Sequence, residues 1–348
     1  MHNHSIIHLL RLAYESGASD LHISLDSPPI LRIDGLLKPV EGEFISSEEA
    51  WGMAEFLLGT KGYEEFQERG ELDFAYSLED GHRFRINVYK QRGEVSIAAR
   101  LISSQVKGLD ELGLPSVVRT LAEKSQGLIL VTGRAGSGKS STLASIIDHI
   151  NRNERKHIIT LEDPIEYIHT KGSSLVEQRE VGTDTMSFAS GLRAALRQDP
   201  DVILVGEMRD LETITAAVTA AETGHLVLST LHTTDAPQTI DRIMDAFPGD
   251  QQAQIRAQLS SVLVAVISQR LFPKAEGKGR VCAAEVMINT PAVANLIRSD
   301  KTHQIKSVMQ TSKAFGMQTM EMAVRDLVKE GQVLASSAKS YLAEVSSG

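Results

Sequence analysis

The pattern of apolar and polar positions divides the chain into two parts that differ in the periodicity of their apolar residues. Near the N-terminus, Phe84, Ile86 and Val88 alternate with polar neighbours, a period of two that predicts a strand with one buried face. The other elements predicted in this part are helices over 5–16 and 47–58 and strands over 21–24 and 30–33. A small α+β domain is therefore expected at this end of the chain.

From Gly127 onward, short apolar runs alternate with stretches of helical periodicity, as in an α/β fold with a parallel sheet. The runs do not alternate with polar residues, so both faces of the sheet are expected to be covered. The predicted strands are 128–132, 158–161, 202–205 and 226–231, and the predicted helices are 143–150, 187–197, 212–222, 250–271, 291–298 and 317–330.

The length and composition favour a soluble protein of two domains. The chain has 348 residues, 42% of them hydrophobic, and 36 basic against 45 acidic residues leave a net charge of −9, which disfavours a protein that coats nucleic acid. The single cysteine, Cys282, excludes an intrachain disulfide and a thiolate zinc site. No signal peptide or apolar run of membrane-spanning length is recognised, so a cytoplasmic location is expected, with any work at a membrane done through a partner.

A phosphate-binding loop lies between the first predicted core strand and a predicted helix. Its glycines let successive backbone N–H groups surround a phosphate, its lysine reaches the β- and γ-phosphates, and its serine ligates Mg²⁺. The context of strand and helix argues against a chance match. The loop residues are Gly133, Arg134, Ala135, Gly136, Ser137, Gly138, Lys139 and Ser140, and Ser141 follows them.

Acidic residues and a histidine follow the other core strands. Because ligands of open α/β sheets bind beyond the carboxyl ends of the strands, Glu162, Glu207 and His232 are expected at one edge with the loop. Glu207 is the candidate to orient or deprotonate the attacking water; the alternative is a solvated acid. Gly206 stands where many P-loop enzymes have an Asp, so Mg²⁺ would rest on Ser140, phosphates and water, with Glu162 or Glu166 as a further contributor.

Other polar residues admit both a functional and a structural explanation. His232 is a candidate sensor of the γ-phosphate and His225 a weaker one, whereas strand-end histidines often serve as caps or packing residues. Arg83 and Arg85 share the polar face of a strand and are candidate cations for the γ-phosphate or simply solvated. The remaining alternatives are a second arginine pair that could equally form surface ion pairs, Arg193 and Arg197, and an Asp-Pro turn that would explain Glu162 and Glu166.

Four ordered motifs make the chain resemble the secretion-superfamily ATPases, over nearly its whole length. They are the N-terminal segment 18–22, an Asp box over 162–166, a Walker B region over 199–210, and a His box over 223–233. Within that superfamily the chain is similar to the type IV pilus retraction ATPases. Its N-terminal domain is short and starts almost at the first residue, it lacks the tetracysteine zinc loop of extension and type II secretion ATPases, and its C-terminal segment, 292–298, resembles a retraction motif.

The resemblance implies a homohexameric ring of cytoplasmic subunits at the inner-membrane pilus platform, using ATP and Mg²⁺ to retract the pilus for twitching motility. It implies a PAS-like domain (1–102), a linker (103–115), a RecA-like P-loop ATPase core (116–272) and a C-terminal helical subdomain (273–348). It makes Arg83 and Arg85 arginine fingers that act across a subunit boundary, and supports Glu166, His232 and Glu207 as catalytic. Arg209 becomes an interface or phosphate-sensing residue, and a paralogous pilus ATPase becomes a further partner.

The chain departs from the retraction pattern at a few positions. Arg134 and Ala135 stand where the family usually has Pro-Thr, which places an extra cation beside the phosphates. Ala294 and Ser299 replace an Arg and a Glu, so the coupling of hydrolysis to retraction is in question.

Three other functions remain open at the level of sequence. The first is an accessory pilus or DNA-uptake motor that assists retraction. The second is a nucleotide-binding scaffold with little hydrolysis, which the presence of Lys139 and Glu207 disfavours. The third is a nucleic-acid translocase, which the acidic net charge and the lack of an aromatic-basic stripe disfavour.

Overall fold

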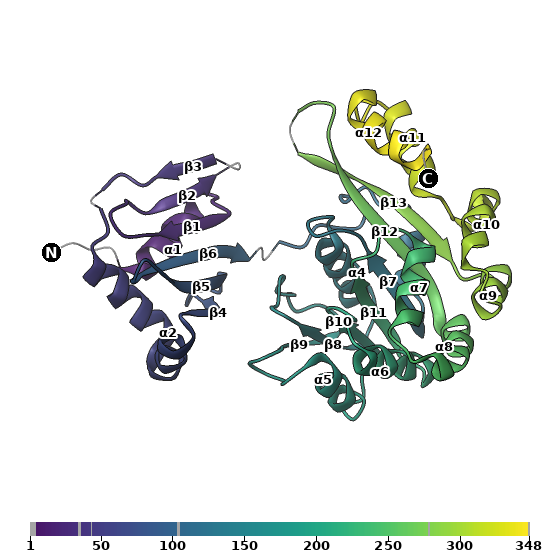
Figure 1. Cartoon of the computed structure of the whole chain (residues 1–348), viewed down its shortest axis with the longest axis horizontal. Coiled ribbons are helices and arrows are strands. Elements are labelled where there is room, and N and C mark those ends of the chain that lie inside the picture. Colours follow the sequence, from purple (N-terminus) through teal and green to yellow (C-terminus); the bar gives the residue numbers. More distant parts are fainter. Residues whose placement is uncertain (1–4, 34–35, 43, 103–104, 278, 347–348) are drawn as a thin grey trace. The chain divides into compact units, whose positions relative to one another are not determined.

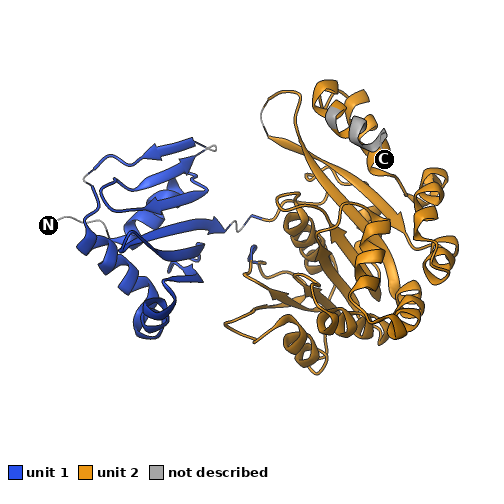
Figure 2. Ribbon diagram, in the orientation of Figure 1, with its two compact units in different colours: residues 1–105, 166–168 blue, residues 106–165, 169–348 orange. Residues whose placement is uncertain are grey.

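The chain packs into two units, each with its own hydrophobic core (Figure 2). The computed structural model describes residues 5–33, 36–42, 44–102, 105–277 and 279–346. Unit 1 comprises residues 1–105 together with 166–168, and unit 2 comprises residues 106–165 and 169–348.

Unit 1 is built on an antiparallel six-stranded sheet in the order β3-β2-β1-β6-β5-β4. The predicted alternation is confirmed, since Phe84, Ile86 and Val88 are fully buried while Arg85 is exposed. The strands are β1 (Asp20–Ile23), β2 (Ile30–Ile33), β3 (Leu36–Pro39), β4 (Glu71–Ser77), β5 (Arg83–Gln91) and β6 (Glu94–Ile102), and the helices are α1 (Ile6–Glu15) and α2 (Ser47–Arg69).

The second helix of unit 1 extends well beyond its predicted end. A capping box between Ser46 and Glu49 starts α2, because each side chain bonds to the other residue's backbone N–H. The helix bends at Gly59, whose φ of 61° lies outside the helical region, and then continues to Arg69. Gly59, which directly follows the predicted end of the helix, therefore bends the helix without ending it.

Unit 2 contains a seven-stranded sheet in the order β13-β12-β7-β11-β10-β8-β9, with helices on both faces (Figure 1). The central strands are parallel, and the residues of β7, β10 and β11 are all buried, as the non-alternating runs predict. The strands are β7 (Gly127–Thr132), β8 (His157–Glu162), β9 (Leu175–Glu180), β10 (Val202–Val205), β11 (Leu226–Leu231), β12 (Leu263–Pro273) and β13 (Arg280–Ile288).

The helices of unit 2 connect and flank these strands. They are α3 (Val117–Ala122), α4 (Lys139–Asn153), α5 (Phe188–Ala195), α6 (Leu211–Glu222), α7 (Ala236–Asp245), α8 (Gly249–Val262), α9 (Pro291–Arg298), α10 (Ile305–Thr311), α11 (Met320–Lys329) and α12 (Ala335–Ser346), with short 3₁₀ turns at η1 (Thr302–Gln304) and η2 (Lys313–Phe315). The bounds of α5, α6, α9 and α11 lie close to those predicted, whereas α4 begins and ends several residues beyond its predicted range of 143–150.

The long helix predicted over 250–271 is wrong in its second half. Helix α8 ends at Val262, and the chain enters β12 directly at Leu263. The apolar residues in this stretch satisfy a helical period, but a fully buried strand has no period of its own to distinguish it from a buried helix. Pairing decides the matter, because β12 lies between β7 and the antiparallel β13.

The C-terminal region is not purely helical. Strand β13 extends the main sheet through its pairing with β12, while α11 and α12 pack together in a smaller cluster with Phe272 and Val281. The region beyond Pro273 therefore contributes both a strand and helices to unit 2.

Candidate functional site

The predicted phosphate-binding loop connects the end of β7 to the start of α4. Its glycines take backbone conformations that other residues rarely adopt, with φ of 144° at Gly133 and 93° at Gly138. A Cβ on Gly133 would lie 2.5 Å from the Ser137 hydroxyl and 2.6 Å from the carbonyl of Gln269, so the loop packs tightly there. The Lys139 ammonium donates to the carbonyls of Gly133 (2.9 Å) and Arg134 (3.2 Å), which bends the loop back over the helix N-terminus.

The strands order the predicted residues along one edge of the sheet. Strands β7, β11, β10 and β8 are neighbours and run in parallel, so the loop, His232, Glu207 and Glu162 follow one another at their carboxyl ends. A buried bond from the Thr132 hydroxyl to Ser268 (2.8 Å) ties the end of β7 to β12 as well. The sheet thus brings together residues that come from four separate motifs of the sequence.

The Glu207 carboxylate is held between two cationic or ionisable side chains. Its Oε2 accepts from the Arg209 guanidinium at 2.8 Å, and its Oε1 lies 3.1 Å from Nε2 of His232. Glu207 is largely buried, whereas Arg209 is 74% exposed, so the guanidinium reaches the carboxylate from the solvent side. The hydrogen bond and the charge of Glu207 raise the pKa of Arg209. The sequence predicted Glu207 and His232 at this edge, whereas Arg209 was expected only from the resemblance, and the pairing of the three was not predicted.

Glu162 and Glu166 have different surroundings. The Glu162 carboxylate accepts from the Thr160 hydroxyl (2.6 Å) and the Gln178 amide (3.2 Å), which fixes it at the end of β8. The Asp163–Pro164 peptide bond that follows is cis, as befits a tight turn. Glu166 is exposed and belongs to unit 1. Glu162 alone of the two thus belongs to the edge of the unit 2 sheet.

The N-terminal arginines lie on β5 of unit 1. Arg85 is exposed and makes a loose ion pair with Asp73 across β4 and β5 (3.7 Å), while Arg83 is half-buried. Their neighbour Phe84 is fully buried on the opposite face. The two guanidinium groups therefore share the polar face of the strand, as predicted.

The other predicted contacts lie away from the loop. His225 precedes β11, at the opposite end of that strand from His232, and its Nδ1 lies 2.9 Å from the carbonyl of Ala220. A strand of this length spans about 20 Å, so His225 caps the C-terminus of α6 and does not reach the loop. Arg193 pairs loosely with Glu212 (3.5 Å), which matches the structural explanation for that arginine pair.

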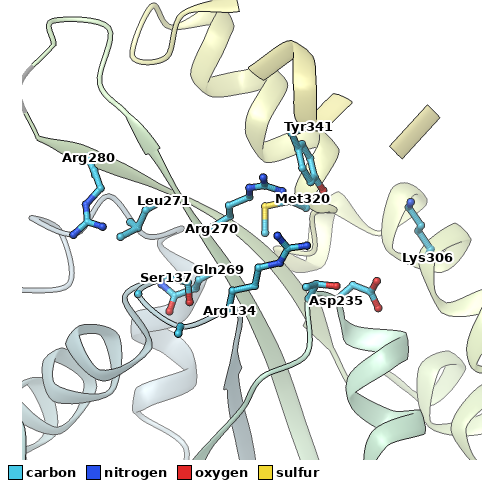
Figure 3. Close-up of a pocket in the computed structure, with 13 residues that line it drawn as sticks. Arg134, Ser137, Asp235, Gln269, Arg270, Leu271, Arg280, Lys306, Met320 and Tyr341 are labelled. Atoms are coloured by element: carbon cyan, nitrogen blue, oxygen red, sulfur yellow. The ribbon is translucent and has the colours of Figure 1, made fainter. Parts of the chain in front are cut away.

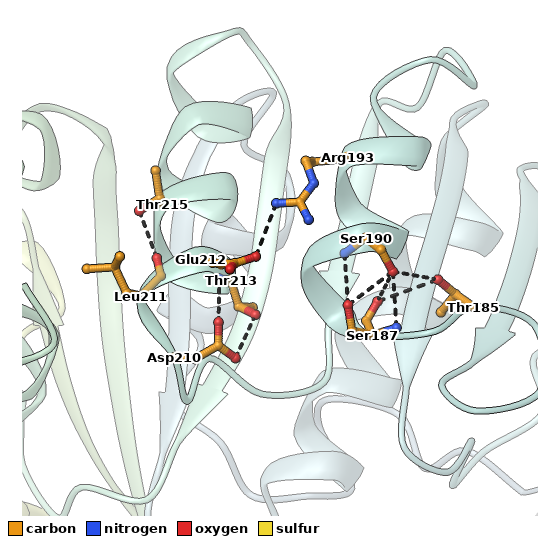
Figure 4. Close-up of polar contacts among 9 residues, drawn as sticks. All are labelled: Thr185, Ser187, Ser190, Arg193, Asp210, Leu211, Glu212, Thr213 and Thr215. Atoms are coloured by element: carbon orange, nitrogen blue, oxygen red, sulfur yellow. Dashed lines mark hydrogen bonds and ion pairs between the residues drawn. The ribbon is translucent and has the colours of Figure 1, made fainter.

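The backbone after Glu207 is fixed by a helix cap (Figure 4). The Asp210 carboxylate accepts from the Thr213 backbone N–H (2.8 Å) and from its hydroxyl (3.0 Å) at the start of α6. Ser187 and Ser190 form a capping box that starts α5 in the same view. The caps set where α6 and α5 begin, and the first of them orients the short segment that carries Glu207 and Arg209.

The donor set suits a hard cation held mainly by phosphate and water. Within residues 5–33, 36–42, 44–102, 105–277 and 279–346, no group of at least three His, Cys, Asp or Glu side chains could hold a metal ion. Mg²⁺ commonly takes one or two protein oxygens beside substrate phosphates, which the Ser140 hydroxyl beside the loop and the Glu162 carboxylate at the neighbouring edge can supply. The same described residues include no helix long and apolar enough to cross a membrane.

A cavity of about 350 Å³ adjoins the outer side of the loop (Figure 3). Its lining comes from the loop, from the segment just before α7, from β12 and β13, and from α10, α11 and α12, and it includes several residues that the sequence did not single out. Arg270 went unrecognised because that stretch was predicted as helix, and Tyr341 lies far along the chain with no motif around it. The lining includes Arg134, Arg270, Leu271, Arg280, Lys306, Met320 and Tyr341.

Known proteins resemble this chain in both sequence and fold. A model of the family described as "Type II/IV secretion system protein" matches residues 74–340. The chain belongs to this family. It is 46% identical to the type IV pilus retraction ATPase PilT of Pseudomonas aeruginosa, over 96% of the chain and 97% of that protein. It is 41% identical to the type IV pilus ATPase PilU of the same organism, over 96% and 87%.

A solved member of this secretion family shares the architecture. The crystal structure of the pilus retraction motor PilT with bound ADP superposes with a TM-score of 0.90 at 47% identity, covering 96% of each chain. The mixed α/β architecture predicted from the sequence is thereby confirmed. The finer descriptions of the N-terminal and C-terminal regions are taken up below as proposals.

Proposed function

We propose that the chain is an ATP-hydrolysing motor that retracts type IV pili. The observation that supports hydrolysis most directly is the Glu207 carboxylate, held by Arg209 and His232 at the sheet edge where the loop ends. The similarity to a named pilus retraction ATPase, over nearly the full length of both proteins, supports the biological role.

Phosphate binding would rest on the loop and on α4. Backbone N–H groups of the loop and the positive end of α4 attract the phosphates, and Lys139 would exchange its bonds to Gly133 and Arg134 for phosphate oxygens. The Ser140 hydroxyl would hold Mg²⁺, which would supply charge neutralisation on the transferred group. Glu162 would hold a water of the magnesium shell.

Glu207 would position and deprotonate the attacking water. A carboxylate has about four acceptor sites, and Arg209 and His232 use two of them, so the carboxylate can still accept a hydrogen bond from water. The two neighbours fix its orientation, which is the main requirement for a general base. Hydrolysis would proceed by direct attack on the γ-phosphorus without a covalent intermediate.

The assembly that we propose is a homohexamer with a PAS-like N-terminal domain (1–102), a linker (103–115), a RecA-like core (116–272) and a C-terminal subdomain (273–348). The polar face of β5 would supply Arg83 and Arg85 as cations to the γ-phosphate of a neighbouring subunit, and Glu166 would join that site. The ring would act in the cytoplasm on the inner-membrane pilus platform, so its contact with the membrane would pass through a partner.

An accessory pilus motor is the second candidate. The 41% identity to a type IV pilus ATPase, PilU, supports this role, in which the chain would assist a paralogous retraction motor. Deletion of the gene separates the two: cells that keep their pili but cannot retract them favour the main motor, and cells that retract with reduced force favour the accessory role. Complementation with Lys139→Ala should fail in either case.

The assembly has its own test. Mixed rings of Arg85→Ala and Lys139→Ala subunits should regain part of the phosphate release that each variant lacks, if the arginines act across the boundary. Mixed rings that assemble and remain inactive would contradict that arrangement. Purified protein that releases no phosphate in the presence of Mg²⁺ and ATP would contradict the motor itself.

A further inference from the structure

Glu285 lies on β13 at the level of the sheet where β7 and β11 end. In the register of the sheet it is opposite Ser268 on β12, and Ser268 is opposite Thr132 on β7. Thr132 is the last residue of β7 before the loop, and its partner on β11, Leu231, directly precedes His232. The row of residues that contains Glu285 therefore reaches the base of the loop and of the His232 segment.

The Glu285 carboxylate bonds to the starts of two helices. The side chain is buried, and one oxygen accepts at 2.9 Å from the backbone N–H of Ala236, the first residue of α7. The other oxygen accepts at 3.2 Å from the backbone N–H of Met320, the first residue of α11. The first N–H groups of a helix have no partner within it, so each bond helps to fix where a helix begins. One side chain thus ties α7 and α11 to the same point of β13.

The start of α7 constrains the segment that carries His232. The Thr233 hydroxyl lies 2.7 Å from that of Thr239 in the first turn of α7, and the Thr239 hydroxyl donates to the Asp235 carbonyl at 2.7 Å. The His232 side chain is 49% exposed, so packing alone does not fix its ring. Its placement against Glu207, at 3.1 Å, therefore depends on this backbone, and a shift of α7 would change it.

Further contacts dock the start of α11 on β13. The backbones of Val286 and Gln318 exchange hydrogen bonds of 2.9 and 3.1 Å, and the Gln318 amide donates to the Ala284 carbonyl at 2.7 Å. The Thr319 hydroxyl caps the first turn of α11. Glu285 lies between Ala284 and Val286, so the docking of α11 sets the surroundings of the carboxylate that also bonds to α7.

We propose that Glu285 is a positioning residue for hydrolysis, through which the docking of α11 on β13 determines the placement of His232 against Glu207. The proposal rests on hydrolysis by Glu207, as set out above. It gives the C-terminal helices control over the rate of hydrolysis without any contact between them and the Glu207 carboxylate. A displacement of α11 would disturb the carboxylate that bonds to α7 and slow the chemical step, while Lys139 and the loop keep their own contacts.

A cycle of double variants separates positioning from stability. Phosphate release by the full-length protein with Mg²⁺ and ATP would be measured at a temperature where circular dichroism shows every variant folded. Glu285→Gln keeps the size of the side chain and replaces one acceptor oxygen by an amide nitrogen. It should lower kcat roughly 10- to 100-fold and keep the KM for ATP within about twofold.

The second arm of the cycle uses a His232→Ala background. There, Glu285→Gln should lower kcat by less than about twofold, because the contact that it disturbs is already gone. An equal factor in both backgrounds would show that Glu285 does not act through His232 and would overturn the proposal. No loss of kcat in the parent background would overturn it as well.

Hydrogen exchange followed by mass spectrometry gives a readout that does not depend on turnover. Without nucleotide, Glu285→Gln should speed amide exchange in a peptide covering residues 232–239 and leave exchange over 143–150, in α4, as in the parent. Unchanged exchange over 232–239 would overturn the proposal.

A pair of variants at Thr319 tests the link to α11 and does not require that Glu285→Gln folds. Thr319→Ala removes the cap of α11 and should lower kcat about 3- to 10-fold, whereas Thr319→Ser keeps the hydroxyl and should stay near the parent. Thr290→Ala removes the cap of α9, which begins after β13, and should change neither kcat nor KM. Equal effects of Thr319→Ala and Thr290→Ala, or no effect of either, would overturn the link.

Glu207→Gln separates this proposal from the function on which it rests. If Glu207→Gln keeps its rate, the assignment of the hydrolysis site is itself wrong. A slow Glu207→Gln variant beside a Glu285→Gln variant of normal rate would overturn the positioning role alone.

Discussion

Glu285 is a buried carboxyl that joins three elements of unit 2. Only 3% of its surface is exposed, and its two oxygens accept from the backbone N–H of Ala236 (2.9 Å) at the start of α7 and of Met320 (3.2 Å) at the start of α11. Burial raises the pKa of Glu285 to about 7, although the two hydrogen bonds oppose the shift. Its protonation is therefore linked to the stability of the strand and both helix starts.

The sign of this linkage follows from which state binds the proton. Between pH 4.5 and 7 the unfolded chain has lost the proton of Glu285 while the folded chain keeps it, so stability falls as pH rises. The shift from 4.5 to about 7 corresponds to about 3 kcal/mol of stability, which is present in full below pH 4.5 and is lost by pH 7.

A half-buried histidine opposes this trend in the same unit. Burial lowers the pKa of His169 from 6.5 to about 4, with Asp148 opposing the shift. The unfolded chain then binds the proton first as pH falls, so about 3 kcal/mol that is present above pH 6.5 disappears toward pH 4. The two groups offset each other over nearly the same interval, and single substitutions should separate them.

Urea unfolding followed by circular dichroism, at several pH values between 4.5 and 6.5, would measure the separation. Glu285→Gln should leave a free energy of unfolding that rises with pH, and His169→Gln one that falls, each by about 1.4 kcal/mol per pH unit relative to the parent protein. The informative quantity is the slope of the free energy of unfolding against pH. A hydrogen bond lost in either variant lowers this free energy by the same amount at every pH and leaves the slope unchanged. Profiles of both variants that run parallel to the parent's would refute the assignment of the shifts to burial.

Three further predictions concern the site. Glu207→Gln should lower the rate of phosphate release by about 10²- to 10⁴-fold and keep the Kd of ADP within a few-fold. Glu212→Gln, which removes a carboxylate from the loose pair with Arg193, should change neither quantity. A Glu207 variant that keeps its rate would show that Glu207 is not the base. Gly133→Ala should raise the Kd of ADP at least tenfold, because its Cβ meets Ser137 and the Gln269 carbonyl. Gly136→Ala, whose Cβ has nothing within 4 Å, should lose less affinity for ADP. Equal losses of affinity in the two variants would show that backbone strain alone matters. Burial raises the pKa of Cys282 to about 11, so iodoacetamide at pH 8 should label it slowly in native protein and fast in urea, as mass spectrometry would record; equal rates would mean that the thiol is accessible.

The fold was predictable where one period dominates a segment. The alternation around Phe84 and the non-alternating runs at β7, β10 and β11 predicted their strands, because those residues pack on one face or on both. The boundary between α8 and β12 was not predictable, because Leu263 and its neighbours are apolar in any register and pairing with β7 decides their structure. Local patterns cannot report a partner strand that lies far away in the sequence.

The candidate site shows the same division. Motifs gave the loop and the residues at the strand ends, since parallel strands bring their carboxyl ends to one edge. The ion pairs that hold Glu207 depend on rotamers of Arg209 and His232, which the sequence does not encode in any simple period. The part of the cavity lining outside the loop was not predictable, because Arg270 and Tyr341 meet only through the packing of β12 and α12.

The central position of β7 affects how the protein forms during synthesis. Leu130 pairs with Ser229 on one side and with Val266 on the other, and both partners are translated long after it. Non-local pairing of this kind slows folding and leaves strand edges open to other chains in the meantime. A nascent chain that has not yet reached β12 contains every residue of the loop but lacks the Gln269 carbonyl against which Gly133 packs. Nucleotide binding should therefore be acquired late in translation, after the strand that begins at Leu263 has left the ribosome.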